Sequence, residues 1–329
     1  METGAQMQIK KTGGLAGLFK TYKIEFCMFF VLMGIFVVMH IITGKALSSR
    51  NMLNVFQAAA PYLIMAMGEL MIVVTGGIDM SVGSVFSLSG MVGTLTMINY
   101  GIAPGVIAAL VTGLGCGACT GLLVSKLKMA PFISTLAMHG AASSLTFIIA
   151  GGNSQTVNQP DFALFDKGDF FFGIPNYIFY MVLAVVIMQF VMRKTLFGRW
   201  VYATGSNEEA ARLVGVPTAK VKMTCYSLCG MFCGLAAMLN ASYLMTVECT
   251  AGTGMEMSVI AATVIGGASL SGGLGTPIGA AIGAMVMVTI RNSINLMGIN
   301  SFWDGTVTGI VIVIAVLIST MSAQKRARG

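Results

Sequence analysis

Charged residues are scarce in this chain. Only 9% of its 329 residues are Asp, Glu, Lys or Arg, whereas 56% are hydrophobic, and the mean hydropathy is +0.85. A soluble domain has about a quarter of its residues charged, so this composition excludes a soluble domain. Helices satisfy their backbone polar groups internally, as a lipid bilayer requires. We therefore expect an all-α polytopic membrane protein.

Clusters of metal ligands and nucleotide-binding motifs are lacking as well. The two histidines stand alone in their segments, and the 27 methionines are scattered. Cys116 and Cys119 form a C-x-x-C pair in a Gly-rich apolar segment without histidines, which favours packing over a metal or redox site. Phe19 stands where a phosphate-binding loop over 14–21 would need glycine. We expect no metal, no cofactor and no ATP hydrolysis by this chain itself.

Long apolar runs dominate instead. A span needs roughly twenty apolar residues, and the first run is too long for a signal peptide and lacks a small-residue cleavage site. We predict one transmembrane domain over 24–321 with cytoplasmic tails at 1–23 and 322–329. The ten candidate spans, of which the eighth is short enough to be a half-helix, are 24–43, 53–74, 82–99, 104–124, 131–150, 175–192, 223–244, 256–268, 276–294 and 303–321.

The basic residues gather in alternate loops. With the N-terminus placed inside, fifteen of the nineteen Lys and Arg residues fall in inside segments and three in outside loops. This asymmetry follows the positive-inside rule and places both termini in the cytoplasm. It also accounts for the net charge of +7, so no nucleic-acid partner is implied. The longest outside loop, 151–174, is either a plain connector or a docking surface.

A polar loop at 193–222 interrupts the apolar sequence on the predicted cytoplasmic side. Ser206 and Glu209 have the S-x-x-E spacing of a capping box, and Gly215 followed by proline is typical of a helix end. A helix of about two turns is marginal alone. It is either a docking helix for a soluble partner or an amphipathic loop on lipid headgroups. Its apolar face carries Ala210, Leu213 and Val214.

Two glycine-rich breaks resemble each other at an offset of 190 residues. Segments 76–83 and 266–273 match at the two leading glycines, an apolar residue, a serine and the last glycine. Paired breaks of this kind point to a substrate path in transporters, and the alternative is two tight turns. Glu69 and Glu256 lie beside them, and such carboxylates face the bundle interior or water. For Glu69 we expect a hydroxyl or backbone amide as partner, because the sequence supplies no charge at helical spacing for a proton or sodium site.

Several blocks resemble a known family. Residues 75–84 (TGGIDMSVGS) are similar to the TGGIDLSVGS signature of the ribose-type sugar permeases of ATP-binding-cassette (ABC) importers. Residues 202–215 resemble the cytoplasmic coupling motif of those permeases, with EAA-x-x-x-G spacing from Glu209 to Gly215. Blocks 260–273 and 292–298 resemble two more, and the likeness runs from about residue 50 to 320. It implies a transport subunit, not an enzyme, that carries a small polar solute, with a monosaccharide expected.

The resemblance and the breaks together select two sets of residues. Coupling to the ATPase is expected from Ser206, Asn207, Glu208, Glu209, Ala210, Ala211, Arg212 and Gly215. A translocation path is expected along Gly76, Gly77, Asp79, Ser81, Gly83, Glu256, Gly266, Gly267, Ser271, Gly273, Asn292 and Asn295. The implied partners are cytoplasmic ABC ATPase subunits holding ATP and Mg, an extracytoplasmic solute-binding protein and a second permease copy, identical or homologous. The implied location is the bacterial cytoplasmic membrane.

Three positions depart from the family pattern. Ser258 stands where the family usually has Asp, Arg291 where it has Asn, and Asp304 where it has an amide. These positions bear on which solute or binding protein is served, and the solute stays open. Two rival interpretations are an ion-coupled secondary transporter and a purely structural membrane subunit. The cytoplasmic helix disfavours the first, because a single-chain carrier needs no partner there, and the glycine breaks disfavour the second.

Overall fold

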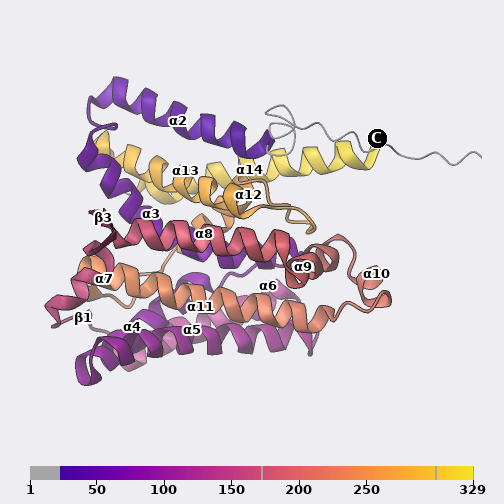
Figure 1. Cartoon of the computed structure of the whole chain (residues 1–329), viewed down its shortest axis with the longest axis horizontal. Helices are drawn as coiled ribbons and strands as arrows, with labels where there is room; N and C mark the ends of the chain where they lie inside the picture. The colour runs from indigo at the N-terminus through magenta and orange to yellow at the C-terminus, as the bar shows by residue number, and fades with distance from the viewer. Residues whose placement is uncertain (1–22, 172, 301, 329) are drawn as a thin grey trace, which may run out of the picture.

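The computed structural model describes residues 23–171, 173–300 and 302–328 as a bundle of roughly aligned helices (Figure 1). The helices are α2 (Lys23–Thr43), α3 (Ser49–Val74), α4 (Val82–Tyr100), α5 (Ile102–Ser125), α6 (Pro131–Ala150), α7 (Ala163–Lys167), α8 (Asn176–Lys194), α9 (Leu196–Ser206), α10 (Glu208–Leu213), α11 (Thr218–Leu244), α12 (Met255–Ile265), α13 (Pro277–Leu296) and α14 (Trp303–Arg328). A short 3-10 turn, η1, covers Pro160–Phe162. Two antiparallel pairs of short strands, β1 with β4 and β2 with β3, are formed by β1 (Gln155–Thr156), β2 (Asp169–Phe171), β3 (Ile174–Pro175) and β4 (Thr246–Val247).

Each predicted span coincides with a helix, which confirms the all-α polytopic fold class. Eight of the described helices are long and apolar enough to cross a membrane: α2, α3, α4, α5, α6, α8, α11 and α13. α12 has only 11 residues, or about 16 Å at 1.5 Å per residue, so it covers about half of a bilayer core. α14 continues through the predicted C-terminal tail to Arg328. The predicted N-terminal tail lies, except for Lys23, outside the described residues.

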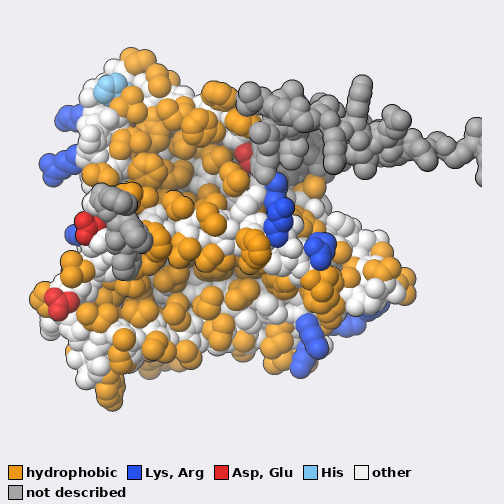
Figure 2. All heavy atoms as spheres, viewed as in Figure 1, with side chains coloured by type: hydrophobic (Ala, Val, Ile, Leu, Met, Phe, Trp, Pro, Cys, Tyr) orange, Lys and Arg blue, Asp and Glu red, His pale blue; other side chains and the backbone are white. Residues whose placement is uncertain are grey.

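The two ends of the bundle differ. The short strands and α7 lie at the left end in Figure 1, and α9 and α10 lie at the right end. We call these the α7 end and the α10 end. Figure 2 shows hydrophobic side chains over most of the flank between them, with Lys and Arg side chains gathered toward the ends. This distribution suits a bundle whose flank lies in lipid.

Helix α3 forms the centre of the core. From Ala59 to Val74 every residue except Tyr62 is buried, and α3 packs against α8, α11, α12 and α13. By contrast, α2, α5 and α6 leave many large apolar side chains exposed, as lipid-facing helices do. A helix buried on all sides is held as a unit by its neighbours, so α3 is a rigid axis of the bundle.

Close helix crossings depend on residues without side chains. A Cβ on Gly113 of α5 would lie 2.1 Å from the carbonyl oxygen of Gly230 on α11, and one on Gly230 would lie 2.0 Å from that of Gly113. The backbones of α12 and α13 meet in the same way at Gly266 and Gly279, with corresponding distances of 2.3 and 2.0 Å. Membrane helices gain packing contacts where small residues let backbones approach. The abundant glycine of the sequence serves this packing.

Candidate translocation path and coupling loop

The short helix predicted in the polar loop is present as α10, but its N-terminal cap differs from the prediction. Asn207 has extended backbone angles (φ −162°, ψ 104°), and its Oδ1 accepts a hydrogen bond of 2.9 Å from the Ala210 amide. Ser206 is instead the last residue of α9. The predicted capping box of Ser206 with Glu209 is therefore wrong, because an N-cap residue stands outside helical geometry and Ser206 is still helical.

The C-terminal end of α10 is as predicted. Gly215 adopts a left-handed conformation with φ +87°, which favours glycine. Its amide donates to the Arg212 oxygen at 3.0 Å, and the Val216 amide donates to the Ala211 oxygen, also at 3.0 Å. These two bonds form a Schellman motif. The predicted helix stop at Gly215 is confirmed.

The apolar side chains of α10 point away from the rest of the chain. Leu213 is 86% exposed and Val214 80% exposed, whereas Ala211 is buried. The remaining predicted coupling residues Glu208, Glu209, Ala210 and Arg212 are exposed. Glu208 Oε2 pairs with Lys222 Nζ at 2.5 Å and ties α10 to the first turns of α11. Helix α10 is thus fixed at both ends, and Figure 1 shows that it projects from the bundle.

Helix α9 was not predicted from the sequence, although its signals are present. Thr195 caps it, since its Oγ1 accepts a hydrogen bond of 3.1 Å from the Gly198 amide. Gly198, Val201 and Thr204 share a buried face at helical spacing. The loop at 193–222 therefore holds two helices, and α9 lies between α10 and the bundle.

The two glycine breaks lie against each other and against the end of α9. The Gly273 amide donates to the Val74 oxygen at 2.8 Å. A Cβ on Gly205 would lie 1.7 Å from the Val74 oxygen and 2.7 Å from the Gly273 nitrogen. We call this contact of Val74, Gly205 and Gly273 the junction. It lies at the α10 end, and Ser206 and Ser271 border it: a Cβ on Gly273 would lie 2.7 Å from Ser206 Oγ, and one on Gly76 would lie 3.9 Å from the Ser271 oxygen.

Beyond Gly76 the first break folds back into the bundle beside α3. The Asp79 amide donates to Glu69 Oε1 at 3.1 Å, and Asp79 Oδ1 accepts from the amide (2.8 Å) and hydroxyl (2.5 Å) of Ser81. All three residues are buried. The expected backbone-amide partner of Glu69 is confirmed, and it comes from the break itself. Gly77 is buried in the same turn, where a Cβ would lie 2.7 Å from Tyr226 Oη.

The half-helix α12 begins deep in the bundle. Segment 248–254 runs from β4 at the α7 end into the bundle. There the Gly252 amide donates to Ser87 Oγ on α4 at 2.8 Å. A Cβ on Gly83 would lie 2.3 Å from the Gly252 oxygen and 2.4 Å from Glu256 Oε2. Gly83, Glu256 and this irregular segment therefore meet at the first turns of α4. Irregular backbone at membrane depth is tolerated where protein or a water-filled cavity surrounds it.

Not every predicted path residue joins this group. Asn292 on α13 exchanges two side-chain hydrogen bonds, of 3.0 and 3.1 Å, with Asn51 at the start of α3. Asn295 is exposed one turn further along. Both lie toward the α7 end, away from the junction. Gly267 belongs to the second break but packs against α2, because a Cβ there would lie 2.8 Å from Ile24 Cγ2.

The three positions that depart from the family pattern form one cluster. Arg291 Nη2 donates to Ser258 Oγ at 3.0 Å, and Arg291 Nε pairs with Asp304 Oδ2 at 2.8 Å. The guanidinium also donates to Tyr62 Oη and lies 5.1 Å from the centre of that ring. This cluster joins α3, α12, α13 and α14. No spacing rule could reveal it, because its members come from four helices.

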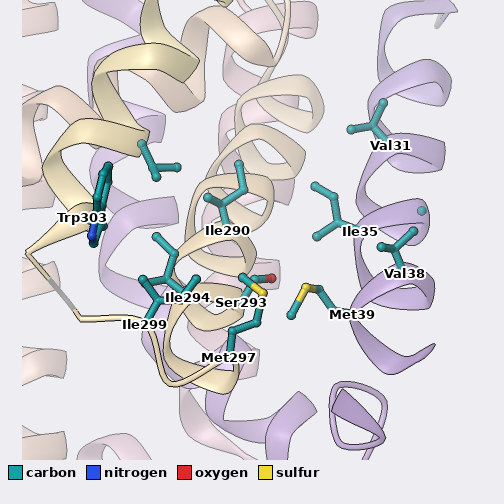
Figure 3. Close-up of a pocket in the computed structure, with 12 residues that line it drawn as sticks. Val31, Ile35, Val38, Met39, Ile290, Ser293, Ile294, Met297, Ile299 and Trp303 are labelled. Carbon is teal, nitrogen blue, oxygen red and sulfur yellow. The ribbon is translucent and has the colours of Figure 1, made fainter. Parts of the chain in front are cut away.

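A wide groove lies elsewhere, between α2, α13 and α14 (Figure 3). Its volume is about 830 Å³, and α2 contributes Val31, Ile35 and Val38. Ser293 is polar, but its hydroxyl donates to the Thr289 oxygen of its own helix at 2.8 Å. Apart from Ser293 and the indole nitrogen of Trp303, the groove therefore offers apolar surface of the kind that lipid covers.

The broken helices, the half-helix and the projecting α10 define a membrane permease that works with a soluble partner. The comparisons agree: residues 51–316 match the family described as branched-chain amino acid transport system / permease component. The chain is 41% identical to the probable ABC transporter permease protein y4mJ of Sinorhizobium fredii, over 94% of this chain and 93% of that one. It is 40% identical to the ribose import permease protein RbsC of Bacillus subtilis (86% and 88%). It is 34% identical to the fructose import permease protein FrcC of Rhizobium meliloti (84% and 80%).

The chain belongs to this family of ABC importer permeases. It is a transport subunit and not an enzyme, and a multi-pass protein of the inner membrane. A permease of an ABC importer works with an ATPase and a solute-binding protein, so partners of these kinds follow from the family. No solved structure matches the chain.

The junction yields a direct test of close packing. Gly205→Ala should destabilise the protein by about 1–3 kcal/mol, because its Cβ would meet the Val74 oxygen at 1.7 Å. Gly140→Ala is the matched control, since Gly140 lies in α6 with nothing within 4 Å of an added Cβ. That change should be neutral or stabilise by up to about 1 kcal/mol. The measurement is thermal unfolding in detergent, and equal midpoints for the two variants would contradict the junction.

Proposed function

We propose that this chain forms the translocation path of an ATP-driven importer for a monosaccharide. The observation that carries the proposal is α10, which presents Leu213 and Val214 to solvent on a helix fixed at both ends. Such a surface suits a soluble partner that must stay attached while it moves. Relatives of this chain are named for the transport of ribose, fructose and L-arabinose. These names support a monosaccharide as the solute.

Coupling would run from α10 through α9 to the junction. ATP-driven closure of the ATPase subunits displaces α10. Tyr202 of α9 donates a hydrogen bond of 2.7 Å to the oxygen of Gly275, two residues after the second break. Gly205 contacts the end of α3 at the same place. Movement of α9 therefore acts on both breaks together. Through α3 and α12 it reaches the residues that surround segment 248–254.

The proposal includes an orientation and a set of partners. The α10 end faces the cytoplasm together with both termini, and the α7 end faces the binding protein. ATP and Mg reside on the ATPase, so this chain needs no cofactor of its own. Because one chain offers one α10, a pair of ATPase subunits calls for a second permease copy, identical or homologous.

Cysteine labelling tests the orientation. Leu164→Cys on α7 and Val214→Cys after α10 place thiols at residues that are 61% and 80% exposed. In intact cells a membrane-impermeant maleimide should label the first variant, and it should label the second only after permeabilisation. The parent protein, whose seven cysteines are native, gives the background. The opposite labelling pattern would show that the α10 end faces outside and would contradict the proposed orientation.

Reconstitution tests the function itself. Permease, ATPase and binding protein in proteoliposomes should take up labelled ribose, fructose or arabinose only when ATP is supplied, and ionophores should not stop uptake. An ion-coupled carrier would instead transport without the ATPase and lose uptake when the ion gradient collapses. That second result would replace the proposal with its main rival.

A charge placed on α10 tests the coupling surface. Leu213→Asp should release the ATPase during purification and lower sugar uptake by at least tenfold, because truncating or charging an interface anchor costs about 2 kcal/mol or more. The permease itself should stay folded, since this side chain is 86% exposed. Leu127→Asp is the control, on another loop at the α10 end and 63% exposed. Normal ATPase binding by the Leu213 variant would show that α10 is only a surface loop.

A further inference from the structure

A small, partly open cavity lies at the α7 end, between α3, α7, α11 and segment 248–254. Its volume is about 180 Å³. We call it the polar chamber, because polar side chains from three helices converge on it. They are Gln57 and Tyr62 from α3, Asp166 from α7, and Asn240 and Tyr243 from α11. The groove of Figure 3 lies between other helices and has none of these groups.

Helix α7 is held firmly over the chamber. The Asp166 amide donates to Ser242 Oγ at 3.0 Å, and the Ser242 hydroxyl donates to the Phe162 oxygen at 2.6 Å. The Asp166 carboxylate accepts from Gln57 Nε2. These bonds tie the loop at 151–174 to α11 and α3. This part of the loop is therefore a packed cover of the bundle and not a plain connector.

Two polar groups in the chamber, the Asn240 amide and the Tyr243 hydroxyl, have no hydrogen-bond partner in the described part of the chain. The Asn240 side chain makes no hydrogen bond to any described residue, and it is half-buried. An amide brings two donors and an acceptor, and at this half-buried position they are open to water or to a solute. Asp166 and Gln57 bond each other but keep further acceptor and donor positions. The chamber thus has free hydrogen-bonding capacity at four residues, with Tyr243 the fourth.

The chamber also has aromatic and apolar walls. Tyr62 and Tyr243 line it together with Leu239 and Met255. The Arg291 guanidinium donates a hydrogen bond to the Tyr62 hydroxyl and so fixes the Tyr62 ring. The C–H face of a sugar ring packs well on an aromatic face, while amides and carboxylates bond its hydroxyls. Few polar groups in an otherwise apolar cavity give orientation and specificity.

We propose that the polar chamber is the site where the permease holds one neutral monosaccharide ring on its way from the binding protein to segment 248–254. This inference rests on the proposed function. It adds to it the residues that contact the sugar. Asn240, Gln57 and Asp166 bond the hydroxyls, and Tyr243 and Tyr62 pack on the ring.

The charged residues around the chamber also bear on which sugars it can bind. Burial raises the pKa of Asp166 to about 6, although Gln57 and Lys167 lower it. Near neutral pH the carboxylate is therefore mostly ionised, and Lys167 lies 5.4 Å from the Tyr243 ring, at the rim. An ionised carboxylate accepts hydrogen bonds from hydroxyls. Because Lys167 beside it carries the opposite charge, the two residues add no net charge, which suits a neutral sugar.

Uptake by the reconstituted complex tests the chamber with a matched pair of variants. The probe is whichever of labelled ribose, fructose and arabinose the wild-type complex transports. Asn240→Leu should raise the half-saturating sugar concentration about tenfold, the effect of one lost set of hydrogen bonds. Asn99→Leu is the control, since Asn99 is exposed and bonds only Leu95 of its own helix. Thermal unfolding in detergent should be alike for the two.

A second variant fills the chamber without removing a polar group. Ala58→Trp places a ring in the cavity and should lower uptake at least tenfold with normal ATPase binding, whereas Ala103→Trp, at an exposed site on α5, should not. If the wild type transports a sugar and both chamber variants match their controls, the chamber is not the solute site and the proposed function stands. If the wild type transports none of the sugars with ATP, the proposed function fails and this inference fails with it.

Discussion

The hydrogen bond from the Gly273 amide to the Val74 oxygen is the contact on which the arrangement of this permease depends. Where a helix breaks inside a membrane protein, backbone groups lose their helical partners and must find others, because lipid offers none. Here the end of α3 is paired with the second break. The pairing brings segments about 200 residues apart into contact, and Gly205 gives α9 access to the same point.

Buried and half-buried ionisable side chains are held by the same rule at both levels of the bundle. Glu69 takes the amide of Asp79 near the first break, and Arg291 pairs with Asp304 nearer the α7 end. A charge inside a membrane protein is costly unless it is paired or faces water. Each pairing joins elements that would otherwise be linked only by apolar contacts. The polar groups therefore specify which helices meet, while apolar packing supplies most of the cohesion.

Helix α3 connects the two places to which function is assigned. Gln57 in its first half and Tyr62 at its middle line the polar chamber, and Val74 at its end belongs to the junction. The stretch between them is almost wholly buried, so a displacement at one end is passed along a packed helix instead of being absorbed by a flexible loop. Half-helix α12 runs beside it and begins where segment 248–254 leaves the chamber. In the proposed coupling mechanism, these two elements would form the mechanical route.

The sequence alone determined the spans, the half-helix, the places of both breaks and the end of α10 at Gly215, because hydropathy, length and glycine act locally. It did not determine the cap of α10, since that depends on how far α9 extends. Glu69 with Asp79, the cluster around Arg291 and the polar chamber were decided only by tertiary structure. Their members lie on different helices, and a pattern read along one chain segment carries no information on which helices pack together.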